Sequence, residues 1–570
     1  MGSTVNDNPY GLKLFITMIE EKAALIPSHT WLRFPGEDWE NNGYTTVTWR
    51  QYLNGINKVA HWLDQTLGKS SDNDAVAYAG PNDIRYALIW AAVVKTGRKL
   101  LVCDGRITGE GLKGLLTATQ AKAWLFADDR WTLDAASVQG VTTKQQSFPS
   151  LRWCLDADEA ADYPYNKTWE EAKDDEILII HTSGTTGFPK AIWCTNGFIA
   201  NQQMAKVVSK IYWPQVFFAD VQAKRVGISA YPPKWGAGLG YMVMYPVFAD
   251  HVTVVLPADT IGLPPDLFKK VLRWNPDVEG LHGPPQTIAG LWKDPTTQPL
   301  LKELHFIIYA GAAMDQTIGD EISLHTRVMP LIGSTEGGLR FYPVAKDRKL
   351  WNTFAYIAEG PHRMVKRKGY GDAEDGSDDL YELVIDRPAD GSRGWFFGTF
   401  WNLRWYKDAN AVETRELYSP VTDLDGTTRW VFRARTDDLT KLSFLAKFNA
   451  AHIEARILRH PYVKHVLVGG EGRPAPYVLI EAKDELLGQK PAEELLNTIY
   501  SEIVAQANQE DIGEIKIPRQ TVFLAKKEKP FKISLKALVL RRETEAEYRE
   551  EIDKIYADFE ADRSGAKDEK

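Results

Sequence analysis

Ten residues, HTSGTTGFPK at positions 181 to 190, combine the residue types that can grip a phosphate group. Two glycines, Gly184 and Gly187, remove Cβ atoms, so backbone N–H groups can close on phosphate oxygens. Lys190 supplies a positive charge, and hydroxyl side chains add hydrogen-bond donors. The hydroxyl residues are Thr182, Ser183, Thr185 and Thr186. The segment therefore predicts a loop that binds the phosphates of a nucleotide.

An apolar run directly before this loop predicts the strand that positions it. Residues 177–180 are rich in β-branched side chains, as is typical of strands buried in a parallel sheet. The spacing differs from that of a P-loop kinase or GTPase, because Phe188 and Pro189 separate Gly187 from Lys190. A surface turn rich in glycine and threonine is the alternative, and the preceding strand favours the phosphate loop.

The loop resembles the phosphate-binding loop of the adenylate-forming superfamily, which includes acyl-CoA synthetases, adenylation domains of non-ribosomal peptide synthetases, and luciferases. The family pattern is Thr/Ser-Ser-Gly-Thr-Thr-Gly-x-Pro-Lys. Further motifs follow in the family's order from about residue 20 to residue 560, closest in character to fungal synthetase-like enzymes. The resemblance implies that a carboxylic acid and ATP with Mg²⁺ give acyl-AMP and pyrophosphate, after which a nucleophile displaces AMP.

A second motif, PLIGSTEG at residues 330–337, resembles the family's Tyr-Gly-x-Thr-Glu signature. By that match Thr335 bonds a phosphate oxygen, and Glu336 holds Mg²⁺, which prefers oxygen ligands. Ile332 stands where the family has the aromatic residue that stacks on adenine, and an aliphatic side chain can cover the ring by dispersion. Two further nucleotide contacts are Gly333 and Ser334. A helix N-cap turn is the alternative for this string.

Two other segments of the large domain resemble the adenine and acid sites. Small residues Gly311 and Ala312 lie in the string YAGAAM, where they let backbone groups approach adenine and the substrate. The string YPPKWGAG at 231–238 resembles the region that lines the acid pocket. It contains no Asp to pair an α-amino group, so Trp235 would wall an aromatic or apolar acid, unless it is plain packing. The substrate residues in this interpretation are Trp235, Gly236, Gly238 and Gly311.

The resemblance continues towards the C-terminus with substitutions. Glu416 stands where the family has the aspartate that binds both ribose hydroxyls, and Arg415 stands at the preceding glycine. Arg435 would contact ribose or phosphate, and Asp437 would be the hinge. Leu445 replaces the glycine of a hairpin used in the second half-reaction, which argues against ordinary thioester formation unless it is drift in a surface turn.

The basic segment KALVLRR at 536–542 resembles the ending that carries the family's catalytic lysine. In that register Lys536 would stabilise charge between the carboxylate and the α-phosphate, together with Thr335 and Lys190. Lys532 is a rival for this role. Solvated surface is the alternative for any lysine of the run.

Helical and strand patterns alternate along most of the chain, which predicts an α/β fold with a large N-terminal adenylate-forming domain. We place it at residues 1–436 and a small, mobile α+β lobe at 437–570. Helices of the large domain are expected at 52–67, 84–94, 112–118 and 265–274, and strands at 75–78, 100–103, 124–127, 252–256 and 305–310. In the small lobe we expect strands at 430–435, 463–468 and 477–480, and helices at 450–460, 492–507 and 543–559.

Composition excludes several classes of function. The chain has 570 residues, a net charge of −8 and no basic stripe, so we expect no nucleic-acid partner. Three scattered cysteines form no disulfide framework or metal knuckle. Without a secretory signal, a membrane-spanning run or a terminal address, we expect a cytoplasmic protein with no membrane partner.

The acceptor of the acyl group is left open by the sequence. No carrier segment follows Lys536, so we expect a small carboxylic acid to be passed to CoA, a separate carrier protein or an amine. The alternative is a degenerate, non-catalytic adenylation-like domain that binds a nucleotide or a partner protein. It is motivated by the substitutions at Ile332, Arg415, Glu416 and Leu445.

Overall fold

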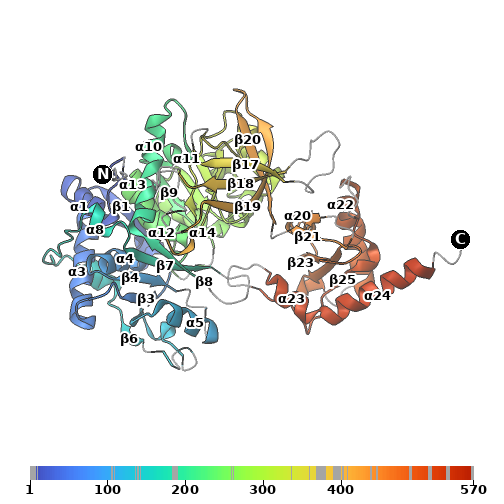
Figure 1. Ribbon diagram of the computed structural model, residues 1–570, viewed down its shortest axis with the longest axis horizontal. Helices are drawn as coiled ribbons and strands as arrows, with labels where there is room; N and C mark the ends of the chain where they lie inside the picture. Colours follow the sequence, from blue (N-terminus) through green and yellow to red (C-terminus); the bar gives the residue numbers. More distant parts are fainter. Residues whose placement is uncertain are drawn as a thin grey trace. The chain divides into compact units, whose positions relative to one another are not determined.

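The computed structural model of the chain resolves two compact units (Figure 1). The first comprises residues 1–364, 384–413 and 420–431, and the second comprises residues 365–383, 414–419 and 432–570. The residues that the structure describes are 8, 10–103, 107, 109–134, 137, 140–141, 143–182, 190–258, 260, 262–335, 337–357, 360–367, 380–388, 400, 403–406, 408–436, 439–443, 447–486, 491–510, 516–533 and 539–565.

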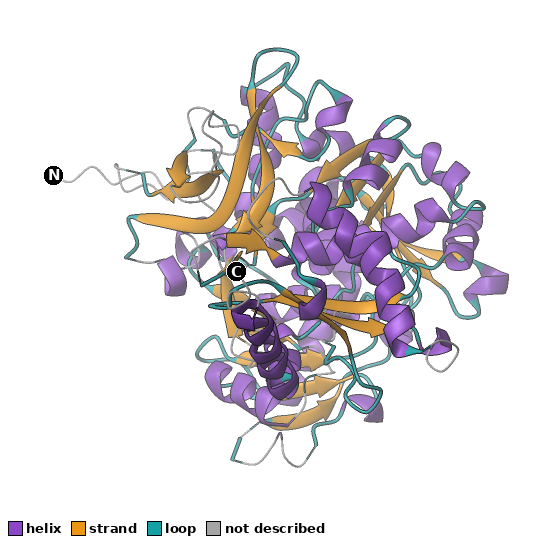
Figure 2. Ribbon diagram, turned by 90° about the vertical axis from the view of Figure 1, so that its right-hand side faces the viewer, coloured by secondary structure: helices purple, strands orange, loops and turns teal. Residues whose placement is uncertain are grey.

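Helices and strands alternate through the first unit, as the sequence predicts (Figure 2). One sheet has six strands in the order β6-β5-β3-β4-β7-β8, parallel except for the antiparallel pair β7 and β8. These strands are β3 (Ala75–Ala79), β4 (Lys99–Val102), β5 (Ala123–Phe126), β6 (Lys144–Ser147), β7 (Glu176–Thr182) and β8 (Lys190–Thr195). The helices among them include α3 (Trp49–Leu67), α4 (Arg85–Lys95) and α5 (Gly109–Thr119).

A second sheet of this unit has seven strands in the order β13-β12-β11-β9-β10-β1-β2. They are β1 (Thr30–Pro35), β2 (Tyr44–Thr48), β9 (Val226–Ser229), β10 (Val252–Val255), β11 (Gly280–Gly283), β12 (Phe306–Tyr309) and β13 (Arg327–Pro330). All neighbours are parallel except β1 and β2. Strand β10 lies on one side of β9 and β11 on the other, so the strand order reverses at β9. In open parallel sheets, ligands bind beyond the carboxyl ends of the strands at such a point.

A third sheet, β16-β20-β19-β18-β17, consists of strands from residues 353 to 435. They are β16 (Thr353–Phe354), β17 (His362–Arg367), β18 (Leu380–Asp386), β19 (Ala411–Thr422) and β20 (Thr428–Arg435). The sequence analysis expected only the last of these strands. Charged residues alternate with apolar ones along β17 and β19, so neither strand has the uniformly apolar run of a buried strand.

The C-terminal unit is α+β, with a three-stranded sheet in the order β23-β24-β25. The strands are β23 (Val463–Gly469), β24 (Tyr477–Ala482) and β25 (Val522–Leu524), and the helices include α20 (Ala450–Ile457), α21 (Ala492–Ile499), η7 (Tyr500–Val504), α22 (Ala505–Glu510), α23 (Arg541–Glu547) and α24 (Arg549–Gly565). The single helix expected at 543–559 is wrong, because the chain breaks at Tyr548. The buried Tyr548 side chain accepts a hydrogen bond from the Lys526 amide at 2.9 Å, which holds the break in place.

Helices form where the sequence supplies both an apolar face and a cap. Helix α3 begins at a capping box in which Thr48 and Gln51 exchange hydrogen bonds, and its apolar face is buried. All residues of α4 are buried, and Phe15 stacks on its Trp90. The largest buried cluster joins α3 and α4 to apolar side chains from both large sheets. All three cysteines are buried, and none of them forms a disulfide bond.

A polar layer lies under the seven-stranded sheet where helix η3 (Gly240–Met244) packs on it. The ring of Tyr241 lies 4.0 Å from that of His282, and His251 meets His282 edge-on at 5.0 Å. All three side chains are fully buried or nearly so. The Nδ1 atom of His251 lies 3.1 Å from the Gln222 carbonyl, whereas neither ring nitrogen of His282 has a hydrogen-bond partner among the described residues. Burial lowers the pKa of both histidines, to about 4 for His251, so both stay neutral near pH 7.

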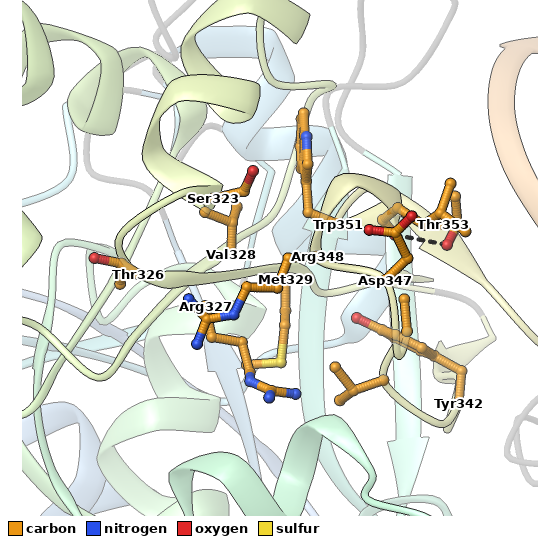
Figure 3. A pocket seen from close by; sticks show the side chains of 13 residues that line it. Ser323, Thr326, Arg327, Val328, Met329, Tyr342, Asp347, Arg348, Trp351 and Thr353 are labelled. Carbon is orange, nitrogen blue, oxygen red and sulfur yellow. Dashed lines mark hydrogen bonds between the residues drawn. The ribbon is translucent and has the colours of Figure 1, made fainter. Parts of the chain in front are cut away.

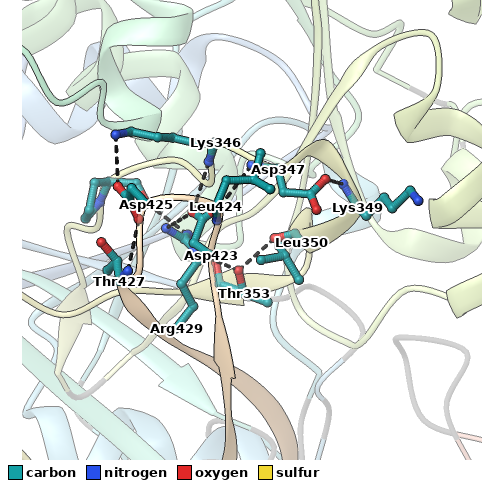
Figure 4. A network of polar contacts seen from close by, with 11 residues as sticks. Lys346, Asp347, Lys349, Leu350, Thr353, Asp423, Leu424, Asp425, Thr427 and Arg429 are labelled. Atoms are coloured by element: carbon teal, nitrogen blue, oxygen red, sulfur yellow. Dashed lines mark hydrogen bonds and ion pairs between the residues drawn. The ribbon is translucent and has the colours of Figure 1, made fainter.

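A buried ion pair holds the turn between β19 and β20 to the loop at residues 342–353 (Figure 4). The Asp423 carboxylate lies 3.6 Å from the Arg429 guanidinium and accepts the backbone amides of Lys346 and Asp347, each at 3.0 Å. Arg429 also donates to the Thr353 hydroxyl at 2.6 Å. Since the surrounding groups satisfy both charges, the pair fixes the path of this loop.

Replacing Asp423 with alanine should destabilise the protein by about 3 kcal/mol or more, because it leaves the Arg429 charge buried without its counter-ion. Asp425→Ala is the matched control: Asp425 lies in the same turn and pairs with the exposed Lys346. It should cost less than about 1 kcal/mol. Denaturant unfolding of the two variants measures the difference, and equal losses would contradict a special role for the buried pair.

The neutral histidines should make the protein sensitive to acid. A histidine whose folded pKa is lowered binds fewer protons than in the unfolded chain, so stability is complete above pH 6.5 and falls as pH drops towards the folded pKa. For His251 the loss at pH 5 is about 2 kcal/mol.

His282→Phe should reduce the fall in unfolding free energy between pH 7 and pH 5, because it removes one of the two buried titrating groups and no hydrogen bond. His29→Phe is the matched control, at an exposed histidine that forms no ion pair among the described residues, and should leave the pH dependence unchanged. Urea unfolding at the two pH values tests both variants. An unchanged slope in His282→Phe would show that His282 does not remain neutral in the folded protein.

Candidate functional site

Segments that follow β9, β12 and β13 meet at one edge of the seven-stranded sheet. Trp235, Ala310 and Leu331 come from these three segments, and all pack on one cluster that includes the buried Tyr231 and Tyr241. They meet because the strands are parallel neighbours and end at the same edge. The structure thus brings together three segments that the sequence analysis singled out separately: the expected acid-pocket string, the expected adenine string and the string with the Thr-Glu motif.

Tyr231 ties the segment after β9 to the end of β11. Its hydroxyl donates to the Gly283 carbonyl at 2.8 Å, across the point where the strand order reverses. The ring also stacks near Tyr241, with 5.9 Å between centroids. Burial raises the pKa of Tyr231, so the hydroxyl remains a donor. The sequence analysis did not select Tyr231 as a positioning residue, although it opens the YPPKWGAG string.

Of the two glycines after Trp235, Gly238 is required by close packing. A Cβ atom on Gly238 would overlap the backbone carbonyl of Pro232, so the turn accepts no larger residue. A Cβ atom on Gly236 would lie 3.5 Å from the Cδ1 atom of Ile180 in β7. The proposed acid segment therefore lies beside the strand that leads directly into the predicted phosphate loop.

The predicted phosphate loop lies in the sequence between β7 and β8, which pair as antiparallel neighbours. Thr182 pairs with Lys190 across the two strands, and Lys190 is exposed at the first position of β8. The structure thus confirms the strand before the loop. The remaining predicted loop residues lie outside the described residues: Ser183, Gly184, Thr185, Thr186 and Gly187.

The turn after β12 is open to solvent. Gly311 has φ +96°, which a residue with a side chain rarely adopts, and nothing lies within 4 Å of its missing Cβ atom. Ala312 beside it is also exposed. A planar ligand could therefore approach the backbone here, as expected for an adenine contact.

The Thr-Glu segment forms a short hairpin, so the alternative of a helix N-cap turn is wrong. Strands β14 (Gly333–Ser334) and β15 (Gly338–Leu339) pair antiparallel, and the Ser334 hydroxyl accepts the Gly337 amide at 2.9 Å. The Arg340 amide donates to the Ile332 carbonyl at 3.1 Å and closes the base. Ile332 and Thr335 are half-buried, and Gly333 and Ser334 are exposed. Glu336, the expected magnesium ligand, lies outside the described residues.

The expected ribose contacts lie on strands of the second unit. Glu416 is half-buried in β19 and accepts the Tyr418 hydroxyl at 2.7 Å, while Arg435 is exposed at the end of β20. Arg415 has φ +61°, the left-handed region that favours glycine, so the backbone keeps the conformation that suits the family's glycine. Its amide donates to the buried Glu382 carboxylate at 2.9 Å.

Of the two candidate lysines, the structure describes only Lys532. The Lys532 ammonium lies 2.8 Å from the Glu547 carboxylate, so its charge is already paired. Ile533 and Val539 form an isolated β-bridge on either side of the segment that contains Lys536. Lys536 itself, like Asp437 and Leu445, lies outside the described residues. Within the described ranges, no cluster of three or more His, Cys, Asp or Glu side chains could hold a metal, and no helix is long and apolar enough to cross a bilayer.

Arg415→Gly should raise the free energy of unfolding by about 0.5–1 kcal/mol, because relief of the left-handed strain exceeds the added entropy of the unfolded chain. Arg415→Ala removes the same exposed side chain but keeps the Cβ atom, so it should bring no gain. Denaturant unfolding compares the two variants. An equal gain in both would mean that the arginine side chain, rather than backbone strain, limits stability.

Two curated relatives align with nearly the whole chain. A carboxylic acid reductase of Neurospora crassa is 29% identical over 563 residues, which cover 97% of this chain and 51% of the relative. The isocyanide synthase-NRPS hybrid crmA of Aspergillus fumigatus is 28% identical over 572 residues, which cover 98% of this chain and 34% of the relative. The chain therefore spans about half, or less, of the length of these relatives.

The fold is also that of solved enzymes. The crystal structure of ATP-bound MatB from Rhodopseudomonas palustris superposes with a TM-score of 0.67 at 17% identity, covering 94% of this chain and 99% of that one. Residues 19–355 match the AMP-binding enzyme family, and residues 437–560 match the AMP-binding enzyme C-terminal domain. Since the first match alone covers more than half of the sequence, the chain belongs to the AMP-binding enzyme family of the adenylate-forming superfamily.

Proposed function

We propose that the protein activates a small carboxylic acid with ATP, forming acyl-AMP and releasing pyrophosphate. The observation that carries this proposal is the meeting of Trp235, Ala310 and Leu331 at one sheet edge. Gly236 of the same segment lies beside Ile180, which directly precedes the phosphate loop. An acid held near Trp235 would thus be close to the α-phosphate of an ATP whose adenine lies at Gly311. Proximity of this kind lowers the barrier to attack.

The residues of this chain bind and orient the nucleotide. The loop from Thr182 to Lys190 takes the phosphates, Thr335 donates to a phosphate oxygen, and Glu416 and Arg435 bind the ribose. Ile332 covers the adenine by dispersion. The carboxylate of Glu336 and the hydroxyl of Thr335 are oxygen donors, which suit Mg²⁺. When bound, the metal would neutralise charge on the phosphates.

Lys536 is the proposed cation at the reacting carboxylate. The pairing of Lys532 with Glu547 supports this assignment, because Lys532 would have to leave its partner to act. The domain boundary between residues 436 and 437, with Asp437 as the hinge, stays a prediction. So does the preference for an aromatic or apolar acid, which depends on Trp235.

The proposal includes transfer of the acyl group to an acceptor but does not choose among three kinds of acceptor. Displacement of AMP by CoA, by a carrier protein or by an amine would give a thioester or an amide. The similarity to a carboxylic acid reductase supports a carboxylic acid as the substrate. The relatives contain a further half or more that has no counterpart in the alignment, so their complete reactions are not carried over.

A second candidate function is a degenerate domain that binds nucleotide or a partner protein without catalysis. The substitutions at Ile332, Glu416 and Leu445 favour it. The left-handed backbone at Arg415 weighs against it, because this position has a conformation that glycine adopts readily although the residue here is arginine.

ATP–pyrophosphate exchange against a panel of aryl, fatty and amino acids, with Mg²⁺ and without an acceptor, tests the proposal. We expect exchange with one class of acid, because adenylation is reversible before the acyl group is transferred. Lys536→Ala should lower the exchange rate about 100-fold or more, as loss of a preorganised charge does in other enzymes. Lys532→Ala is the matched control and should keep the rate within about threefold.

Each outcome of the exchange experiment has a separate meaning. Loss of activity in Lys532→Ala with retention in Lys536→Ala would exchange the roles of the two lysines. ATP binding without exchange for any acid would favour the non-catalytic domain.

A further inference from the structure

A shallow hollow, partly open to solvent, lies at the edge of the seven-stranded sheet opposite to the candidate active site. Figure 3 shows the side chains that line it. Its walls are the start of β13, the end of helix α17 (Gln316–Ser323) and the loop at residues 342–353. Arg327 begins β13, whereas Leu331 of the active-site cluster follows its other end. The four-residue step from Arg327 to Leu331 spans about 13 Å of extended strand. The hollow is therefore separate from the nucleotide segments.

Two guanidinium groups line the hollow without a counter-ion. Neither Arg327 nor Arg348 forms a hydrogen bond or an ion pair through its side chain with any residue that the structure describes. The other donors of the lining are committed: the Thr326 hydroxyl donates to the Leu301 carbonyl and the Trp351 indole to Asp320, each at 2.8 Å. The hydroxyls of Ser323, Tyr342 and Thr353 likewise donate to backbone carbonyls.

The acids near the hollow are engaged elsewhere. The Asp347 carboxylate accepts the Lys349 amide at 2.9 Å, and Asp320 accepts the Trp351 indole. Asp423 lies behind the loop, where it is buried against Arg429. Asp347 belongs to the lining and keeps its negative charge, but among the described residues it forms no ion pair with Arg327 or Arg348, so the lining carries a net charge of +1.

This arrangement has an electrostatic cost. Arg327 is half-buried, and burial, followed by the charge of Arg348, lowers its pKa. An arginine stays charged in proteins, so it cannot escape the cost by losing a proton. Two like charges beside one hollow become favourable when an anion lies between them.

We propose that this hollow is a binding site for a phosphate-type oxyanion held between Arg327 and Arg348. A phosphate group has oxygens enough to accept from both guanidinium groups, whereas the two oxygens of a carboxylate are already occupied by one guanidinium fork. The planar forks of the two guanidinium groups can each offer paired N–H donors to phosphate oxygens. The ion could be inorganic phosphate, pyrophosphate or the phosphate of a nucleotide. The loop that carries Arg348 is held in place by Asp423 and Arg429, so one wall of the site is preorganised.

Calorimetric titration of the whole protein with inorganic phosphate, pyrophosphate, AMP and acetate tests the proposal. We expect the wild-type protein to bind at least one phosphate compound at this site and acetate much more weakly. Arg327→Gln and Arg348→Gln should each weaken that binding about tenfold or more, since each removes a charge-assisted pair of hydrogen bonds. Among the phosphate compounds, the ligand of this site is the one whose binding the two variants weaken most.

Two control variants separate this site from other phosphate sites. Lys349→Gln removes a neighbouring exposed charge outside the lining and should leave the affinity within about twofold. Lys190→Ala removes the cation of the proposed phosphate loop and should retain the binding that Arg327→Gln weakens. This comparison distinguishes a failure here from a failure of the proposed adenylation.

A change in stability gives a second readout. Without phosphate, Arg327→Gln should be as stable as the wild-type protein or more so, because it removes the repulsion from Arg348. With saturating phosphate the wild-type protein should gain more in Tm than the variant. Equal gains in Tm, or equal affinities in titration, would overturn the proposal.

Discussion

Backbone pairing between parallel strands is the constraint on which the candidate site depends. Strands β13, β12, β11 and β9 pair their N–H and C=O groups in this order, and every pair is parallel. Their carboxyl ends then lie along one edge, and every segment that follows must begin there. Three motifs that are up to about a hundred residues apart in sequence are brought together by this one requirement. The backbone thus places the three segments, and the side chains at the edge determine only how these segments pack on one another.

Two glycines allow the backbone to turn and pack closely at this edge. Gly238 lets the chain turn back against Pro232, and Gly311 supplies a left-handed turn with open space beside it. Beneath this edge, Tyr241, His251 and His282 form a layer that is polar yet closed to solvent. Neutral histidines are tolerated there because burial favours the uncharged form. The sheet edge that carries the site therefore packs on a buried layer that accommodates neutral side chains better than charged ones.

Among the described residues, the sequence predicts six of the thirteen strands in the two large sheets, namely β3, β4, β5, β7, β10 and β12, because their apolar runs are continuous. It does not predict the other seven, among them β9, β11 and β13. The sequence does single out the three strings around Trp235, Ala310 and Leu331, which lie together at one sheet edge. It does not reveal β17, β18 and β19, whose charged residues interrupt the apolar pattern. Neither His282 nor the unpaired arginines 327 and 348 belong to a local motif, since their surroundings come from distant parts of the chain. The break at Tyr548 depends on Lys526, a contact that no local pattern contains.

The pairing of β7 and β8 fixes where the loop between them begins and ends. Thr182 faces Lys190 across the ladder, so seven residues connect the two strands. Side chains alternate between the two faces of a strand, and a shift of one residue would carry Lys190 to the opposite face and expose the buried Ala191. Substitutions within the loop change its chemistry one position at a time. An insertion or deletion within β7 or β8 would shift this register, so changes of length in this segment should fall between Thr182 and Lys190 rather than within the strands.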